Sequence, residues 1–271
     1  MTTAGELPPY SVEAFNNAAA LENKIHDDAV ASRYGFSGAL VPGAAVFGYM
    51  AHQPVALWGR DWLERGTADC RFSKPVYDGA SVSVTAARAN DGISLEVRSQ
   101  ARLCATGSAA LPANEPAPAV DAWILSTPPQ SQQRPEADLQ SLAEGTVLCT
   151  APLSATKDLA QEWLADVRET DPLYTLAGLL HPTTLLRLCN WTLIQNVALG
   201  PWIHTASRIR NFKSMPVGAS LVARGVVQKN YEHKGHRIVD LDVLIVIDGK
   251  VPAARILHTA IYLPRQTADS V

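Results

Sequence analysis

Apolar and polar positions follow a similar pattern in two blocks, one in each half of the chain. Segments that alternate apolar and polar residues, or are continuously apolar over a strand's length, predict β-strands. These segments are 81–89, 94–101 and 101–111 in the first block and 219–228, 237–247 and 252–263 in the second. The pairs Asp91-Gly92 and Asp248-Gly249 each separate two of them. An Asp-Gly pair between hydrophobic runs predicts a β-hairpin.

A long apolar run precedes the strands of each block. Pro42 opens the run PGAAVFGYMAHQPVALW, and Pro182 opens the run PTTLLRLCNWTLIQNVAL. Each run predicts a buried helix, and proline is favoured where the helix begins because its missing N–H would have no partner there. A strand at 147–153 and an amphipathic helix at 156–167 are predicted before the second run.

The two blocks are copies of one repeat. The first contains GTADCRFSKPVYDGASVSVTAARA from Gly66, and the second contains HTASRIRNFKSMPVGASLVARGVV from His204. A single sheet cannot cover a buried helix on every side, so two copies are needed to enclose it. We therefore predict an α+β fold with two antiparallel sheets, each wrapped around a central helix. The expected units are 1–111 and 141–271, joined by a proline-rich linker at 112–140.

Composition excludes several classes of function. The chain has 271 residues, of which 47% are hydrophobic and 18% charged, with a net charge of −3. This describes a folded protein without a basic footprint for nucleic acid. Its four cysteines lie far apart without metal-ligand spacing, so we expect neither a metal nor a separate cofactor. No run reaches membrane length and the first residues lack a signal-peptide pattern, so we expect a cytoplasmic protein that does not enter the membrane.

Candidate chemistry is concentrated in a segment that only the first copy has. This segment reads ENKIHDDAVASRYGFSGALVPG from Glu22 to Gly43. Histidine transfers protons near neutral pH, which makes His26 the candidate acid/base. Gly43 begins the predicted buried helix, where backbone N–H groups have no intrahelical partner and can stabilise an oxyanion. Asn23 lies three residues before His26 and favours a helix cap, a role that is compatible with substrate contact.

The same segment resembles the motif of MaoC-like and (R)-specific enoyl-CoA hydratases. That motif has an Asp, a variable residue, Asn, Pro, an aliphatic residue and His, followed by a helix, a loop and a glycine at a helix start. The matching residues are Asn23, Ile25, His26, Ala31, Phe36, Val41 and Gly43. The resemblance implies a double hot-dog fold, with His26 and Asn23 as catalytic residues. It implies that Gly43, Phe36 and Val41 bind the substrate.

The chain departs from this motif at three positions. The family's catalytic Asp falls on Leu21, its Pro falls on Lys24, and the His before the helix glycine falls on Pro42. Leucine neither holds a water molecule nor accepts a proton. The carboxylates considered as replacements are Glu22, Asp27 and Asp28.

The resemblance implies hydration of a 2-enoyl thioester, or dehydration of a 3-hydroxyacyl thioester, carried on CoA or on an acyl-carrier protein. Three alternatives stay open. A thioesterase or an isomerase would use the same site, and a non-catalytic hot-dog subunit would stabilise a hydratase-like partner chain. A homodimer is also compatible with the sequence.

Other polar residues are interpreted structurally. His181 precedes Pro182 and is expected to cap the second buried helix or to contact the first copy. Four further histidines lie in strands or turns without partners at a useful spacing, namely His204, His233, His236 and His258. Lys74 and Lys213 occupy equivalent places in the repeat, and we expect solvated strand edges there, with contact to a CoA phosphate as the alternative.

Overall fold

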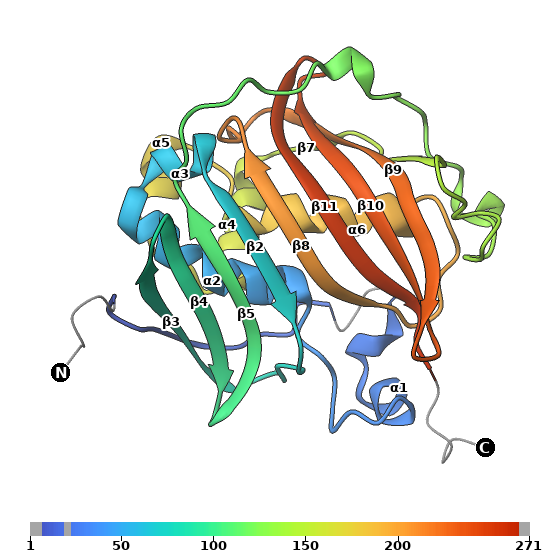
Figure 1. The fold of residues 1–271 in the computed structure, drawn as a ribbon, viewed down its shortest axis with the longest axis horizontal. Helices are drawn as coiled ribbons and strands as arrows, with labels where there is room; N and C mark the ends of the chain where they lie inside the picture. Colours follow the sequence, from blue (N-terminus) through green and yellow to red (C-terminus); the bar gives the residue numbers. More distant parts are fainter. Residues whose placement is uncertain (1–6, 19–22, 266–271) are drawn as a thin grey trace.

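A single large antiparallel sheet forms the framework of the protein. The computed structural model describes residues 7–18 and 23–265. Its 11 strands run in the order β1-β3-β4-β5-β2-β8-β11-β10-β9-β6, with β7 also paired to β9 (Figure 1). The strands are β1 (Tyr10–Glu13), β2 (Thr67–Phe72), β3 (Ser81–Ala89), β4 (Gly92–Ser99), β5 (Arg102–Ala110), β6 (Val147–Cys149), β7 (Leu153–Ser154), β8 (Ile203–Asn211), β9 (Ser220–His233), β10 (His236–Ile247) and β11 (Val251–Leu263).

The two copies of the repeat meet at the pair β2–β8, which we call the seam. Moving outward from the seam, the order is β2, β5, β4, β3 on one side and β8, β11, β10, β9 on the other. This symmetric order is the spatial counterpart of the sequence repeat. The seam is antiparallel, with Thr67 opposite Arg210 and Arg71 opposite Ala206. It joins the two expected sheets into one, because each edge strand satisfies the backbone hydrogen-bonding groups of the other.

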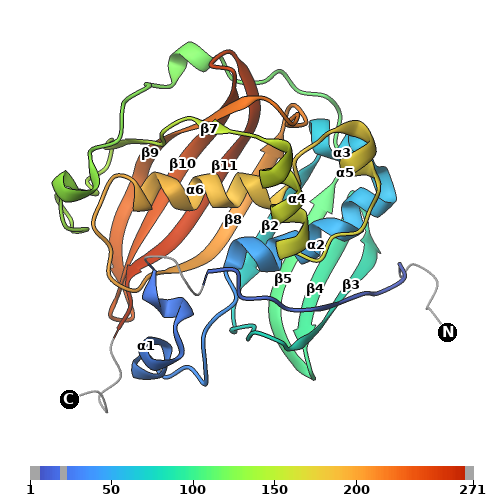
Figure 2. The ribbon, with the colours of Figure 1, turned by 180° about the vertical axis from the view of Figure 1, so that it is seen from behind.

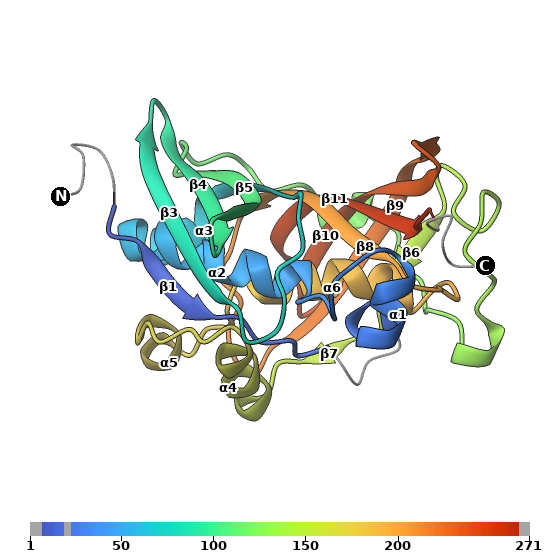
Figure 3. The ribbon, with the colours of Figure 1, turned by 90° about the horizontal axis from the view of Figure 1, so that it is seen from below.

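Two buried helices lie on the same face of the sheet. They are α2 (Gly43–Trp58) and α6 (Thr183–Ile194), and Figure 2 shows both in front of the strands. Figure 3 shows two further helices on the side of α2 and α6 that faces away from the sheet, α4 (Lys157–Asp166) and α5 (Leu173–Ala177). The remaining helices are α1 (Asp28–Arg33) and α3 (Arg60–Arg65). Within residues 7–18 and 23–265, none of these helices has both the length and the hydrophobicity needed to cross a bilayer.

Most predicted strands and helices are confirmed, with shifts at their ends, whereas the strand predicted at 147–153 is divided into β6 and β7. Asp248 and Gly249 form the β10–β11 turn with φ values of 49° and 70°, the left-handed conformation that a two-residue hairpin turn requires. In the first copy the turn falls one residue earlier than expected, on Asn90 and Asp91. Gly92 instead begins β4 opposite Ala110, where a side chain would collide with the carbonyl oxygen of Ala109.

The segment between β5 and β6 crosses the surface in an extended path. It contains two short 3-10 helices, η2 (Val120–Ala122) and η3 (Ser131–Gln133). Arg224 of β9 donates hydrogen bonds to the carbonyl oxygens of Val120 and Trp123, at 3.1 and 3.0 Å. These bonds fix the segment to the second copy.

Polar contacts also connect the two copies on the face of the sheet that carries the helices. The hydroxyl of Thr183, the first residue of α6, donates to the carbonyl oxygen of Ala44 in α2 at 2.8 Å. Nδ1 of His52 in α2 lies 3.1 Å from the buried carboxylate of Glu169, which follows α4. The helices of the two copies are therefore held in register by specific hydrogen bonds as well as by apolar packing.

Candidate active site

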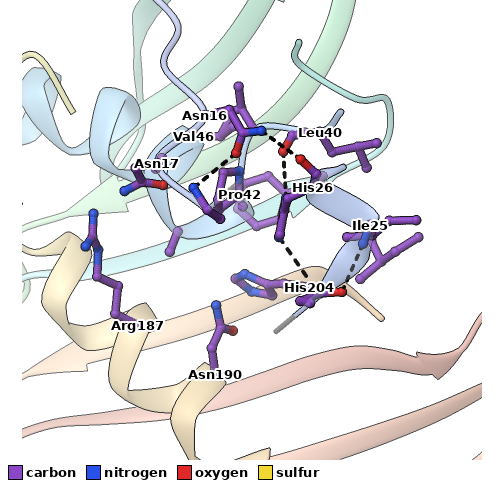
Figure 4. A pocket seen from close by; sticks show the side chains of 18 of the residues that line it. Asn16, Asn17, Ile25, His26, Leu40, Pro42, Val46, Arg187, Asn190 and His204 are labelled. Atoms are coloured by element: carbon purple, nitrogen blue, oxygen red, sulfur yellow. Dashed lines mark hydrogen bonds between the residues drawn. The ribbon is translucent and has the colours of Figure 1, made fainter. Parts of the chain in front are cut away.

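Residues of both copies line a cavity of about 1040 Å³ beside the start of α2. The first copy contributes the hydratase-like segment and the first turn of α2. The second copy contributes α4, α6 and the first residues of β8. All five predicted site residues lie in the wall of this one cavity, namely Asn23, His26, Phe36, Val41 and Gly43. Figure 4 shows part of this wall from close by.

The hydratase-like segment is held by a small apolar cluster of its own. Ile25, Ala31 and Leu40 form the buried centre of this cluster. Tyr34, Phe36, Tyr77 and Ile203 pack around that centre. Because Ile203 is the first residue of β8, the segment of the first copy is anchored on a strand of the second. The position of His26 therefore depends on packing against the second copy.

Asn23 fixes the segment through backbone hydrogen bonds. Its side-chain Nδ2 donates to the carbonyl oxygen of Trp202 at 3.0 Å, and its Oδ1 accepts from the Trp202 N–H at 3.2 Å. The same Oδ1 accepts from the Ile25 N–H at 3.3 Å, a cap-like contact. Asn23 Nδ2 also lies 3.4 Å from His26 Nε2. Asn23 thus orients His26 and ties it to the second copy.

His26 is oriented by a short hydrogen bond. It ends the 3-10 helix η1 (Lys24–His26), and its Nδ1 lies 2.6 Å from the carbonyl oxygen of Leu40. Because a carbonyl only accepts, Nδ1 carries the proton and Nε2 carries the lone pair. Burial lowers the pKa of His26 below its usual 6.5, and the bond to Leu40 partly opposes this shift. His26 is therefore a neutral base near neutral pH.

The carboxylates considered as replacements for the motif Asp have other roles or lie outside the described residues. Asp27 caps α1 by accepting from the Val30 N–H at 3.1 Å. Asp28 accepts from the Ala39 N–H at 2.7 Å and so closes the loop that follows α1. Glu22 and Leu21 lie outside the described residues. Neither Asp27 nor Asp28 belongs to the cavity wall that the described residues form.

Gly43 is the first residue of α2 and faces the cavity. Its N–H lies at the helix N-terminus, where it has no partner within the helix and where the helix dipole is positive. A Cβ at this position would lie 2.9 Å from Nδ1 of His204, and 3.1 and 3.2 Å from two ring carbons of Phe72. The close approach of these two rings therefore requires glycine.

Replacing Gly43 with alanine is expected to lower kcat/KM for a thioester substrate by roughly 10²-fold, because the added methyl group must displace His204 or Phe72. Gly200→Ala is the matched control, since a Cβ there meets no atom within 4 Å. The measurement is steady-state turnover of both variants. Wild-type kcat/KM in Gly43→Ala would show that this close approach does not matter.

His204 is a site residue that the sequence interpretation missed. It lies in β8 and lines the cavity next to Gly43. Figure 4 shows its ring directed toward the same part of the cavity as the ring of His26. The repeat contained an indication of this role, because His204 aligns with Gly66 of the first copy. A large polar residue aligned with glycine marks a position where the two copies differ.

The opposite wall of the cavity is polar. Arg187 of α6 donates to the carboxylate of Asp166 in α4 at 2.6 Å, and its guanidinium stacks on Trp163 with 4.5 Å to the ring centre. Asn17 also donates to Asp166, at 2.8 Å. Asn190, one turn after Arg187, has a buried Oδ1 without a hydrogen-bond partner. The second copy therefore supplies charged and amide groups to a cavity whose histidine base comes from the first.

The remaining residues singled out in the sequence divide between the cavity and the framework. Lys74 is exposed and lines the cavity, whereas Lys213 lies 3.9 Å from Glu64. His181 accepts from the Thr183 N–H at 3.2 Å through Nδ1 and lies against α2 near Gly48, as expected for a cap and an inter-copy contact. Over residues 7–18 and 23–265, no three His, Cys, Asp or Glu side chains are grouped so that they could hold a metal ion.

Comparison with solved structures shows the fold. A double hot-dog protein from Mycobacterium tuberculosis aligns with a TM-score of 0.65 at 12% identity, covering 96% of each chain. A MaoC-like dehydratase aligns with a TM-score of 0.57 at 13% identity, covering 92% of this chain and 96% of its own. An acyl-CoA thioesterase II from Mycobacterium marinum aligns with a TM-score of 0.52 at 12% identity, covering 85% and 92%. No protein-family model and no curated protein matches the sequence. The chain has the double hot-dog fold.

Proposed function

We propose that the protein hydrates a 2-enoyl thioester, or dehydrates the corresponding 3-hydroxyacyl thioester. The observation that carries this proposal is the geometry of His26. Its Nδ1 is tied to the Leu40 carbonyl at 2.6 Å, so Nε2 carries the lone pair at a cavity that also contains the start of α2, and a water molecule has only the long 3.4 Å contact from Asn23 Nδ2 to replace there. A neutral base and a helix N-terminus are the two groups that this reaction needs.

In the hydration direction, Nε2 of His26 removes a proton from water while the water oxygen bonds to C3 of the enoyl group. The electron pair of the C2–C3 double bond moves toward the thioester carbonyl oxygen. The N–H of Gly43 stabilises the negative charge on that oxygen. The imidazolium of His26 then returns its proton to C2, which restores the carbonyl and the neutral histidine. Dehydration is the same sequence in reverse.

The cavity supports a sizeable acyl group. Its volume of about 1040 Å³ is at the upper end of the range for small-molecule sites. Phe36 and Val41 supply apolar surface, while Arg187 and Asn190 supply polar surface. Lys74 at the exposed part of the wall is placed to attract a phosphate of CoA or of a carrier's prosthetic group.

Thioester hydrolysis is the second candidate, and one observation favours it. An acyl-CoA thioesterase II has the same fold over 85% of this chain. The same base and the same oxyanion donor suit attack of water on the carbonyl carbon, with departure of the thiol. The two reactions differ in the carbon that is attacked and in the products.

One assay separates these functions. The purified protein is incubated with crotonyl-CoA, and both the enoyl absorbance and the free thiol are followed. Loss of enoyl absorbance without thiol release supports hydration, whereas thiol release supports hydrolysis. If neither signal changes with crotonyl-CoA or with longer enoyl-CoA probes, the proposed function is wrong. Co-purification with a hydratase-like chain would then favour a non-catalytic partner subunit.

A further inference from the structure

Besides His26, the cavity wall contains another histidine, and one nitrogen of its ring has no hydrogen-bond partner. His204 is buried, and its Nδ1 has no hydrogen-bond partner. Its Nε2 lies 3.2 Å from the carbonyl oxygen of Ala206 and 2.9 Å from the hydroxyl of Ser207. Because the carbonyl only accepts, Nε2 carries the proton and Nδ1 carries a lone pair.

The surroundings of His204 hold this tautomer and this orientation. The Ser207 hydroxyl accepts from His204 Nε2 and is therefore free to donate to His258 Nδ1, 3.0 Å away. The ring of His204 also packs against the rings of Phe72 and His258, with centroid distances of 4.9 and 4.2 Å. A side chain that packs against two rings and is hydrogen-bonded at one nitrogen has only its second nitrogen left for a ligand.

Gly43 lies directly beside that nitrogen. Any other residue at this position would place its Cβ 2.9 Å from Nδ1. The same glycine begins α2 and provides the N–H assigned to the thioester oxygen. Unpaired buried acceptors are costly unless a ligand or a water molecule satisfies them.

We propose that Nδ1 of His204 accepts a hydrogen bond from the water molecule that adds to C3, and that it thereby takes over the water-holding role of the motif carboxylate. This inference rests on the proposed function. In the motif position of that carboxylate the chain has Leu21, which cannot bind water. The second copy thus supplies from β8 the acceptor that the motif of the first copy lacks.

The two histidines have different tasks in this arrangement. His26 Nε2 removes one proton of the water, and His204 Nδ1 accepts the hydrogen bond of the O–H that remains on the product. His204 gains and loses no proton during the reaction. Burial holds its pKa at about 3, so it remains a neutral acceptor throughout the working range of His26.

A pair of variants separates water binding from a structural role. In His204→Asn the side-chain oxygen reproduces the acceptor at Nδ1 but loses the bonds to Ser207 and Ala206. In His204→Gln the amide reproduces the Nε2 side but leaves no acceptor at Nδ1. With crotonyl-CoA as the probe, kcat is expected to fall roughly 10²-fold in His204→Gln and about tenfold or less in His204→Asn, with KM little changed in both. A purely structural role predicts the opposite order.

Thermal unfolding of both variants confirms that each is folded before kinetics are compared. A His204→Gln enzyme that is as fast as His204→Asn or faster would overturn the inference. Failure of the proposed function is distinguishable, because the wild-type protein itself would then not hydrate crotonyl-CoA. If the wild type hydrates crotonyl-CoA without releasing thiol and the order of the two variants is as expected, both proposals are supported.

Discussion

Replacing His26 with asparagine is expected to lower kcat for a thioester substrate by roughly 10³-fold. Asparagine retains an N–H that can donate to the Leu40 carbonyl, so the loop keeps its anchor, but it has no basic nitrogen at the position of Nε2. The expected loss therefore reports the missing base. The measurement is turnover of crotonyl-CoA, with circular dichroism and thermal unfolding showing an intact fold.

A control variant and a pH–rate profile complete this first test. His233→Asn is the matched control, because His233 is exposed at the end of β9 and should leave turnover unchanged. The acid limb of the wild-type pH–rate profile should lie below pH 6.5, since burial lowers the pKa of His26 and a base must be deprotonated to act. Full activity in His26→Asn would remove the catalytic proposal.

The fold is expected to lose much of its stability between pH 6.5 and pH 4. Burial lowers the pKa of His181 to about 4 and that of His204 to about 3, and it lowers that of His258 well below 6.5. These rings stay neutral in the folded protein but bind protons in the unfolded chain below about pH 6.5. Stability is thus fully present above pH 6.5 and falls with decreasing pH.

The size of this effect decides whether the protein unfolds in acid. His181 and His204 each cost about 3 kcal/mol of stability by pH 4, because one pKa unit corresponds to about 1.4 kcal/mol. Their sum reaches the lower part of the stability range of a typical domain, about 5 to 15 kcal/mol, and His258 adds to it in the same direction. We therefore expect unfolding at moderately acidic pH.

Urea unfolding at steps between pH 7 and pH 4.5 measures this dependence. In His258→Asn, the slope of the free energy of unfolding against pH should decrease by the equivalent of about one proton. The amide oxygen can replace Nδ1 as acceptor for Ser207 but cannot be protonated. His233→Asn should leave the slope unchanged, since that ring is exposed. A free energy of unfolding that stays constant down to pH 5 would contradict the expectation.

Local patterns in the sequence are sufficient to predict much of the fold. Strand alternation, the Asp248-Gly249 turn and the two apolar runs depend on residues that are near each other in the chain, and these predictions are confirmed. The repeat adds the symmetric order of the two halves. The seam was harder to predict, because the pairing of β2 with β8 is a contact between segments that lie far apart in the sequence.

The difference between local patterns and long-range contacts also explains which site residues could be predicted. Asn23, His26 and Gly43 belong to one continuous segment, so a motif was enough to group them. His204 and Arg187 reach the cavity only through the packing of the second copy against the first. Spacing along the chain carried no information about that packing. Arg187 and Asn190, three residues apart in a helix that is otherwise made of apolar residues and threonines, were the available indication.

The seam joins two copies that belong to one chain, so the two sides of the seam need not be identical as they would be in a homodimer. Two identical subunits joined in this way would have to build the same site twice, and every substitution would appear on both sides. In a fused chain, one half can keep the proton-transfer segment while the other adapts its wall to the ligand. Under the proposed function, mutations in α6 are therefore expected to alter which acyl groups are accepted without changing His26.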